Sequence, residues 1–508
     1  MDSSASASHA ADRRSAGLER TALILAAIAA FFCALHNQPI EDDVGLLQVR
    51  LGAVSHWSDV PPLLLQSYWG DLFRSGLYRP LTLAVAAAIK LTCGSSLLFP
   101  RMVSLALHAG CTLLVWRLAR RMLTPTGALL TAIVFAVHPI HAEAVITFYG
   151  QSDLWATLFA LAAVILHLRQ SAAGKPSWHF LGVAFFYLLS LGFKESAIAL
   201  PIALGLLRGM IIDKEERGIA RWIGPREIVV ATALVPYVLL RLWVLGGAFG
   251  PGAEAVVGGG QGVFPRVSIL MVTLSTYLQL LVFPWGQTIY YGHLRDRLLA
   301  TGYFEVLILL AAFAALLFLL SPKRPWTLAA GLLLAIGLFP VCGLVPIGVL
   351  VAERCLYFPS VGFALLLGGW LASLPALSSR TVATAVALLI AIGGMVLSAR
   401  VCLRWATPLS VWTTTWADHP RSPRAGATVA LLRLEQEGAS PETLQECDLI
   451  LQRVEEMNPR SPELWQAKSV LARLRGDDER AQQFLDHARA LRPNGSALGW
   501  GIEFAPGS

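Results

Sequence analysis

Three consecutive acidic residues, Glu41, Asp42 and Asp43, follow shortly after an apolar segment that covers residues 21–35. Several arginines precede this segment, and basic residues before a first membrane span hold the N-terminus in the cytoplasm. The acidic triplet is therefore expected at the opposite surface of the membrane. A carboxylate there can act as a general base toward an incoming hydroxyl group. The alternative is a solvated loop without a chemical role.

Three further charged motifs occur between later apolar segments. They contain His138, His141, Glu143 and Asp153 in the first, Lys194 and Glu195 in the second, and Glu353 and Arg354 in the third. Charged residues near membrane depth are costly and usually face a cavity or one another. Each motif alone could be a helix cap or an ion pair between sequence neighbours. Their expected position on one face of the membrane favours a shared functional site.

This set of residues suits the transfer of a group from a phosphate. Arginine and lysine bind phosphate oxygens, and arginine does so through two parallel hydrogen bonds. The residues that we predict to hold the phosphate are Arg79, Lys194 and Arg354. Asp42 or Asp43 is the predicted base, and the sequence does not decide between them. Asp153, together with Glu143, is expected to orient the acceptor or the hydroxyls of a sugar. A lipid-phosphate-linked sugar fits, since its phosphate would lie at headgroup level.

The two histidines of the first motif, His138 and His141, raise the question of a metal site with Glu143. Their spacing matches no established zinc signature. We therefore favour hydrogen bonds that stabilise the loop, and we expect neither a divalent metal nor another cofactor. The seven cysteines include no C-x-x-C pair, which argues against structural zinc and a disulfide framework.

The composition is that of a membrane protein. The 508 residues are 55% hydrophobic and only 14% charged, whereas soluble domains carry about 25% charged residues. Long apolar segments predict an all-α polytopic protein and exclude a β-barrel, which would show short alternating segments. The net charge of +7 resides largely in short basic loops. It indicates orientation and contact with lipid headgroups, and no nucleic-acid partner is expected.

The basic clusters all fall on the cytoplasmic side if the chain crosses the membrane eleven times. After the first span, the predicted spans cover residues 101–117, 126–138, 153–168, 178–193, 196–211, 227–246, 303–320, 326–341, 356–373 and 381–402. Two other apolar segments, residues 78–92 and 265–283, are then predicted to lie at the membrane surface. The alternative, that each of them spans, would place basic clusters outside.

The predicted domain order is a cytoplasmic tail (residues 1–20), a transmembrane domain (21–405, with a first outer loop at 36–100) and a polar, helix-periodic domain (406–508). The last domain repeats a proline motif, and Pro459 and Pro493 are separated by the 34-residue tetratricopeptide period. Helical repeats on the outer side would form a platform for a peptide or protein. A stabilising cap is the alternative.

The motifs considered so far are the acidic pair, YRPL, HPIHAEAV, GQSD, KES and AERCLYFPSVGF. Taken together, they resemble the transmembrane and tetratricopeptide-repeat O-mannosyltransferases of the C-type glycosyltransferase superfamily. The resemblance implies a luminal or periplasmic site, a polyprenyl- or dolichyl-phosphate mannose donor and a protein Ser/Thr acceptor that could dock on the repeats. The acidic residue of the family's first loop falls on Asp42 or Asp43. That of the second loop falls on Asp153 or Glu143, and Arg79 takes the place of the basic residue before Pro-Leu.

The repeat array is shorter than in the animal members, and the Ala, Arg, Gly and Leu content suggests a bacterium. A bacterial protein would lie in the inner membrane with a periplasmic site, and a eukaryotic one in the endoplasmic reticulum. The favoured hypothesis is a metal-independent, inverting glycosyltransferase. The alternatives are the same architecture acting on a surface glycan or glycolipid, a transporter, and a non-catalytic scaffold. A transporter is disfavoured because the charges gather at one face rather than at mid-depth.

Overall fold

The computed structural model describes residues 2–70, 76–94, 96–171, 179–211, 224–247, 263–292, 294, 326–344 and 349–491. Within these ranges every regular element is a helix and no strand occurs, which confirms the predicted all-α class. The predicted span at residues 303–320 and the proline motif at Pro493 lie outside the described residues.

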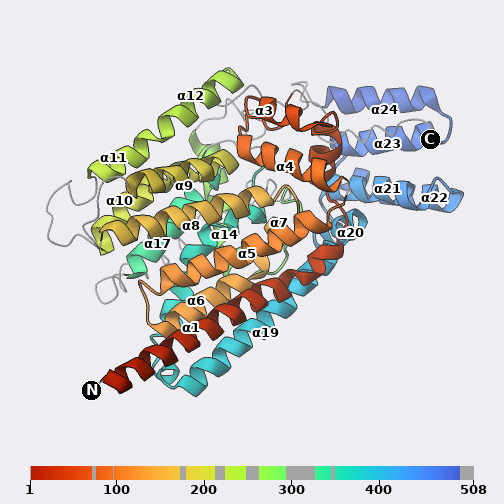
Figure 1. The fold of residues 1–508 in the computed structure, drawn as a ribbon. Helices are drawn as coiled ribbons and strands as arrows, with labels where there is room; N and C mark the ends of the chain where they lie inside the picture. Colours follow the sequence, from red (N-terminus) through yellow and green to blue (C-terminus); the bar gives the residue numbers. More distant parts are fainter. Residues whose placement is uncertain are drawn as a thin grey trace.

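A bundle of long helices forms the body of the molecule (Figure 1). Its helices are α1 (Asp2–Phe31), α5 (Leu98–Ala119), α6 (Pro125–Val137), α8 (Gln151–Ser171), α9 (His179–Phe193), α17 (Trp326–Leu338), α18 (Pro359–Leu371) and α19 (Arg380–Arg404). Helix α1 packs against α5 and α19, α5 against α8, and α8 against α9. Helix α1 begins at Asp2, so the helix of the first span continues through the predicted tail.

Small residues allow the central helices to approach closely, as is common in membrane bundles. A Cβ atom added to Gly362 of α18 would lie 2.5 Å from the carbonyl oxygen of Ala330 on α17. One added to Gly368 would lie 2.5 Å from the backbone nitrogen of Thr131 on α6. These glycines therefore fix α18 between α17 and α6, and α18 follows directly on the AERCLYF segment of the candidate site.

Among the described residues, five helical segments have the length and apolar character that a membrane crossing requires. They are Ala16–His36, Leu98–Ala119, Gln151–Arg169, Glu227–Leu245 and Arg380–Arg404. A sixth is obtained if Pro125–Val137 and Pro139–Ile146, which meet at a bend of 46°, count as one span. The predicted spans at residues 178–193, 196–211, 326–341 and 356–373 contain shorter helices: α9, α10 (Leu200–Ile211), α17 and α18. The total of eleven stays a prediction.

Both segments predicted at the membrane surface are helical. Residues 78–92 contain α4 (Pro80–Cys93), which packs on α3 (Val60–Leu63) and α9. Its 14 residues extend about 21 Å, less than the hydrocarbon thickness of about 30 Å. Residues 265–283 contain α14 (Val263–Val282), whose apolar part Val267–Val282 is shorter than the segments that qualify as spans. The surface location of α14 stays a prediction.

The described part of the polar C-terminal region, residues 406–491, forms five helices: α20 (Pro408–Asp418), α21 (Pro423–Glu437), α22 (Pro441–Met457), α23 (Pro462–Leu474) and α24 (Asp478–Ala490). Ser422, Ser440 and Ser461 each cap a helix by accepting a backbone N–H three residues later, with proline at the first helical position. Helix α21 packs on α22, and α23 on α24. The repeated Ser-Pro signal thus marks helix starts, and the tetratricopeptide assignment stays a prediction.

The two ends of the bundle differ. Figure 1 places the N-terminus at one end, and α3, α4 and α20–α24 at the other. The first outer loop and the C-terminal helices therefore share one end of the molecule. The four motifs that the sequence analysis singled out also meet at this end, as described next.

Candidate active site

A sharp turn presents the acidic triplet. Glu41 has a φ of +47° and is the only described residue other than glycine with a positive φ. Such a backbone conformation is costly and often occurs at functional sites. It starts the one-turn helix α2 (Asp42–Val44), which continues into a π-helical turn over Gly45–Arg50. The turn leaves Glu41 and Asp42 half-buried and Asp43 buried.

Asp43 joins the first outer loop to the loop that follows α7 (Ala142–Ile146). Its Oδ1 accepts hydrogen bonds from the backbone N–H groups of Phe148 at 2.8 Å and Tyr149 at 3.0 Å. Asp43 is only 1% exposed, so its carboxylate is not open to a substrate in this conformation. Its geometry is that of a residue that positions the two loops.

Asp42 is the more accessible of the two aspartates. Burial raises the pKa of Asp42, and the nearby guanidinium groups of Arg354 and Arg79 act in the opposite direction. Burial also raises the pKa of Glu41 to about 8 and that of Asp43 to about 7. The triplet therefore holds carboxylates that are more basic than usual, which suits proton abstraction near neutral pH.

Arg354 and Glu143 form an ion pair beside the triplet. The Arg354 guanidinium donates to Oε1 of Glu143, and the Arg354 backbone N–H donates to Oε2 at 2.9 Å. The Tyr149 hydroxyl also donates to Oε1, at 3.2 Å, and the Arg354 guanidinium lies 4.8 Å from the centre of the Tyr149 ring. The HPIHAEAV and AERCLYFPSVGF motifs are thus held together through the Glu143 carboxylate.

Lys194 and Asp153 form a second, buried pair, with Lys194 Nζ 2.5 Å from Asp153 Oδ1. The side chains are 6% and 8% exposed. The other oxygen, Oδ2 of Asp153, is buried and has no hydrogen-bond partner among the described residues. Buried acceptors without a partner are rare, so Oδ2 is available to a hydroxyl group of a ligand.

Arg79 and Glu195 form a third pair through two parallel hydrogen bonds, of 2.8 Å and 2.7 Å. Burial alone would raise the pKa of Glu195, but the Arg79 guanidinium holds that pKa at about 2. Tyr68 lies beneath Arg79, with 5.3 Å between the guanidinium and the ring centre. Lys194 therefore does not pair with its sequence neighbour Glu195.

Glu353 faces away from Arg354 and has a structural set of partners. Its oxygens accept from the Gln287 amide at 2.8 Å, the Thr288 backbone N–H at 2.9 Å and the Tyr291 hydroxyl at 2.7 Å. Glu353 is fully buried, and burial raises its pKa to about 8. It anchors the segment 287–291 and does not contribute to phosphate binding in this arrangement.

The two histidines make hydrogen bonds between segments. His138 Nε2 lies 2.9 Å from the carbonyl oxygen of Leu281, and its Nδ1 accepts from the Ile140 N–H at 3.2 Å. His141 Nε2 lies 2.8 Å from the hydroxyl oxygen of Ser360. These contacts are of the loop-stabilising kind that the spacing favours. In the ranges that the structure describes, no three His, Cys, Asp or Glu residues are grouped as metal ligands.

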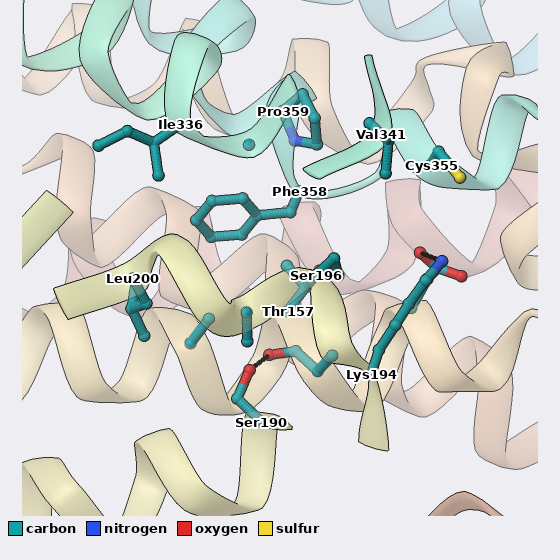
Figure 2. A pocket seen from close by; sticks show the side chains of 15 residues that line it. Thr157, Ser190, Lys194, Ser196, Leu200, Ile336, Val341, Cys355, Phe358 and Pro359 are labelled. Carbon is teal, nitrogen blue, oxygen red and sulfur yellow. Dashed lines mark hydrogen bonds and ion pairs between the residues drawn. The ribbon is translucent and has the colours of Figure 1, made fainter. Parts of the chain in front are cut away.

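An apolar groove leads to the Lys194–Asp153 pair (Figure 2). Helix α8 forms one wall, the Ser196–Leu200 region a second, and the α17–α18 region a third. The lining side chains include Ala156, Thr157, Ala160, Ala197, Leu200, Ile336, Val341, Phe358 and Pro359. The charged pair is its most polar part, and Ser190, Ser196 and Cys355 also line it.

Some residues of the site were not singled out from the sequence. Arg101 is 5% exposed, donates to the Gln38 carbonyl at 3.1 Å and lies within electrostatic range of Asp43. An arginine at the start of a membrane-length helix is a signal that could have identified it. Arg424, which pairs with Glu41 at 3.6 Å, carries no such signal because it lies in the polar C-terminal part.

Comparison with known proteins adds independent information. The family model described as dolichyl-phosphate-mannose-protein mannosyltransferase matches residues 79–243. The Homo sapiens protein named Protein O-mannosyl-transferase TMTC1 is 26% identical over 415 residues, which cover 70% of this chain and 46% of the human protein. Protein O-mannosyl-transferase Tmtc2 of Drosophila melanogaster is 31% identical over 193 residues, which cover 36% of this chain and 19% of that protein. No solved structure gives a significant match.

The matched family region begins at Arg79 and includes the Asp153–Lys194 pair and Glu143. The acidic triplet and Arg354 lie outside it. The chain spans less than half the length of the relatives named above. The contacts described here therefore connect the matched region to elements before and after it.

Proposed function

We propose that this chain is a membrane glycosyltransferase of the protein O-mannosyl-transferase family, to whose members it is similar over part of its length. In this proposal, mannose moves from a polyprenyl- or dolichyl-phosphate donor to a Ser or Thr hydroxyl of a protein. The reaction would take place at the outer end of the bundle, on the periplasmic or luminal side. The relatives' printed names supply the sugar and the acceptor class.

One observation carries the proposal most directly: the apolar groove ends at the Lys194–Asp153 pair. A prenyl chain would occupy the groove, and its phosphate would reach Lys194. The groove is intramembrane in the predicted topology, whereas the charged pair lies at a helix end. This arrangement matches the amphiphilic shape of a lipid-phosphate sugar better than that of a soluble nucleotide sugar.

Asp42 is the base in the proposed reaction. Its carboxylate takes the proton of the acceptor hydroxyl while the hydroxyl oxygen bonds to C1 of the sugar. The bond between C1 and the phosphate oxygen breaks, and the lipid phosphate leaves with that electron pair. Asp42 is chosen over Asp43 because Asp43 is buried and already accepts two backbone hydrogen bonds.

The cations would stabilise the negative charge that develops on the departing phosphate. Lys194, Arg354 and Arg79 are each paired with a carboxylate in this structure. The donor phosphate would therefore share these cations with Asp153, Glu143 and Glu195. A shared arrangement weakens ground-state binding and leaves the cations in place for the transition state.

A single displacement by one base would invert the configuration at C1, whereas retention requires a second carboxylate that acts as nucleophile. Positive charge from lysine and arginine supports a mechanism without a divalent metal. The contacts of His138 and His141 are also compatible with a structural role. Inversion and metal independence both remain proposals.

The test is a transfer assay with the purified full-length protein. Polyprenyl-phosphate [³H]mannose is supplied with a Ser/Thr-rich peptide, and parallel reactions contain polyprenyl-phosphate glucose or a glycolipid acceptor. Label on the peptide, removable by β-elimination, supports the proposal. Label only on the glycolipid would assign the same architecture to a different acceptor, and no transfer from any lipid phosphate would contradict the proposal.

A further inference from the structure

The C-terminal helices contribute a side chain to the acidic triplet. Nη2 of Arg424, near the start of α21, lies 3.6 Å from Oε1 of Glu41. The two side chains are 24% and 17% exposed. In the sequence, almost the whole transmembrane domain lies between the two residues. The ion pair therefore requires that the C-terminal helices pack against this end of the membrane bundle.

The position of Arg424 is fixed by aromatic contacts. Its guanidinium lies 4.7 Å from the ring centre of Tyr290 and 5.6 Å from that of Trp412 on α20. A guanidinium group over an aromatic face is attracted to the electron density of the ring. Nearby, the hydroxyl groups of Thr288 and Thr415 lie 2.9 Å apart, and both residues are buried. The junction is therefore a packed interface that holds Arg424 against the triplet.

Glu41 is also the residue that bears the strained backbone of the turn, with its φ of +47°. A conformation of this kind persists only where surrounding contacts hold it. Among the described residues, Arg424 forms an ion pair with the Glu41 side chain, and the backbone N–H groups of Val44 and Gly45 donate to the Glu41 carbonyl oxygen. Loss of the pair would let the turn relax, and the neighbouring carboxylates would move with it.

We propose that Arg424 is a positioning residue supplied by the C-terminal helices, which holds Glu41 and thereby sets the geometry of the acidic triplet that contains Asp42. The proposal rests on the function proposed above. In this proposal, activity depends on the position of α20 and α21 relative to the bundle. A protein acceptor that binds these helices could therefore change the geometry of the acidic triplet. The C-terminal part is then a component of the active centre as well as a platform.

The electrostatic consequence has a defined sign. The charged groups that act on Glu41 are Arg424, Asp42, Arg354 and Glu143. Arg424 is also among the groups that favour the charged form of Asp42. Removal of the positive charge at position 424 would raise the pKa of both carboxyl groups. The acidic limb of the pH–rate profile would then move to higher pH.

The experiment uses the full-length protein in nanodiscs and four variants: Arg424→Gln, Arg424→Lys, Glu41→Gln and the control Arg433→Gln. Arg433 forms an exposed ion pair with Glu446 between α21 and α22, away from the triplet. Hydrogen–deuterium exchange is measured for the peptide that covers residues 38–46. Sugar transfer from polyprenyl-phosphate mannose is measured from pH 5 to pH 9.

We expect Arg424→Gln and Glu41→Gln each to accelerate exchange in residues 38–46 about tenfold, which corresponds to about 1.4 kcal/mol. Arg424→Lys keeps the charge and restores slow exchange, and Arg433→Gln leaves exchange unchanged. Arg424→Gln also moves the acidic limb to higher pH, and Arg424→Lys reverses this shift. Should Arg424→Gln fail to fold, Glu41→Gln probes the same pair from the other side.

Exchange as slow as in the wild type for both Arg424→Gln and Glu41→Gln would overturn the positioning role. An acidic limb that does not move in Arg424→Gln would also overturn it. The function proposed above fails in a different way: the wild-type protein itself would transfer no sugar. The exchange data would still report on the Arg424–Glu41 contact in that case.

Discussion

The ammonium group of Lys194 lies 2.5 Å from Oδ1 of Asp153, and both side chains are buried at the end of an apolar groove. A buried cation without a partner is costly, because removal from water costs several kcal/mol per ion. The Asp153 carboxylate neutralises this cation, and in the proposed function it would do so until the donor phosphate binds. The Arg354–Glu143 and Arg79–Glu195 pairs follow the same pattern, so each of these three cations has a carboxylate partner.

The first prediction separates stability from chemistry at this pair. Asp153→Asn or Lys194→Met alone leaves one buried charge without its partner, which should cost about 3–5 kcal/mol of unfolding free energy. The double variant removes both charges and should recover most of that loss. Sugar transfer should remain low in all three, because the cation or its orienting partner is missing.

Thermal unfolding in detergent and the transfer rate are measured on the same preparations. A double variant that regained wild-type transfer would show that the pair serves only stability. A double variant no more stable than either single variant would contradict the ion-pair account of this end of the groove.

The second prediction concerns Asp43. Asp43→Asn keeps an oxygen that can accept from the Phe148 and Tyr149 N–H groups, and it should fold. Asp43→Ala leaves both buried N–H groups without a partner, at a cost of about 1–3 kcal/mol each. Melting temperatures should therefore fall in the order wild type, Asp43→Asn, Asp43→Ala, and equal values for the two variants would rule out the anchoring role.

The third prediction tests the groove with two neighbouring residues. Ala197 lines the groove, whereas Ile198 is 43% exposed and does not line it. Ala197→Leu should raise the KM for the lipid-phosphate donor about tenfold, as expected for overpacking by 1–3 kcal/mol. The kcat should change little, because the loss concerns uniform binding.

Ile198→Phe is the matched control and should leave the KM for the donor unchanged. The comparison is made by steady-state kinetics at several donor concentrations in the same detergent. Equal KM values for Ala197→Leu and the wild type would indicate that the donor chain binds elsewhere.

The fourth prediction follows from the raised pKa of Asp43. Burial raises this pKa from 3.8 in the unfolded chain to about 7 in the folded protein. The folded state therefore binds more protons than the unfolded state between these values, and the free energy of unfolding falls as the pH rises from about 4 to about 7. Melting curves at pH 5 and pH 8 should show lower stability at pH 8. Asp43→Asn should reduce this difference, and a wild-type protein that becomes more stable toward pH 8 would contradict the assignment.

The sequence predicted the residue types of the site better than their partners. Lys194 and Glu195 are adjacent, and so are Glu353 and Arg354, yet neither neighbouring pair forms an ion pair. A 3-10 turn begins at Glu195 and another at Glu353, so consecutive side chains in each motif point in different directions. Pairing with Asp153, Arg79 and Glu143 depends on helix packing, which hydropathy does not encode.

The helical class was predictable because long apolar segments allow few alternatives. The residues at which the helices begin and end were harder to predict from the sequence. The segment at residues 356–373 reads as one span, but Pro359 begins α18 and the residues before it form a 3-10 turn. The contribution of Arg424 was not predictable, because the Ser-Pro helix starts at Ser422 and Ser461 are equivalent in sequence and only the fold places Arg424 beside Glu41.

The central claim is that Asp42 removes the acceptor proton beside a lipid phosphate held by Lys194, Arg354 and Arg79. The most direct measurement is the rate of [³H]mannose transfer from polyprenyl-phosphate mannose to a Ser/Thr peptide by wild type and Asp42→Asn, with melting temperatures in parallel. We predict a loss of roughly 10²–10⁴-fold in Asp42→Asn, with the melting temperature essentially unchanged. A correctly folded Asp42→Asn protein that transfers mannose at the wild-type rate would contradict the account.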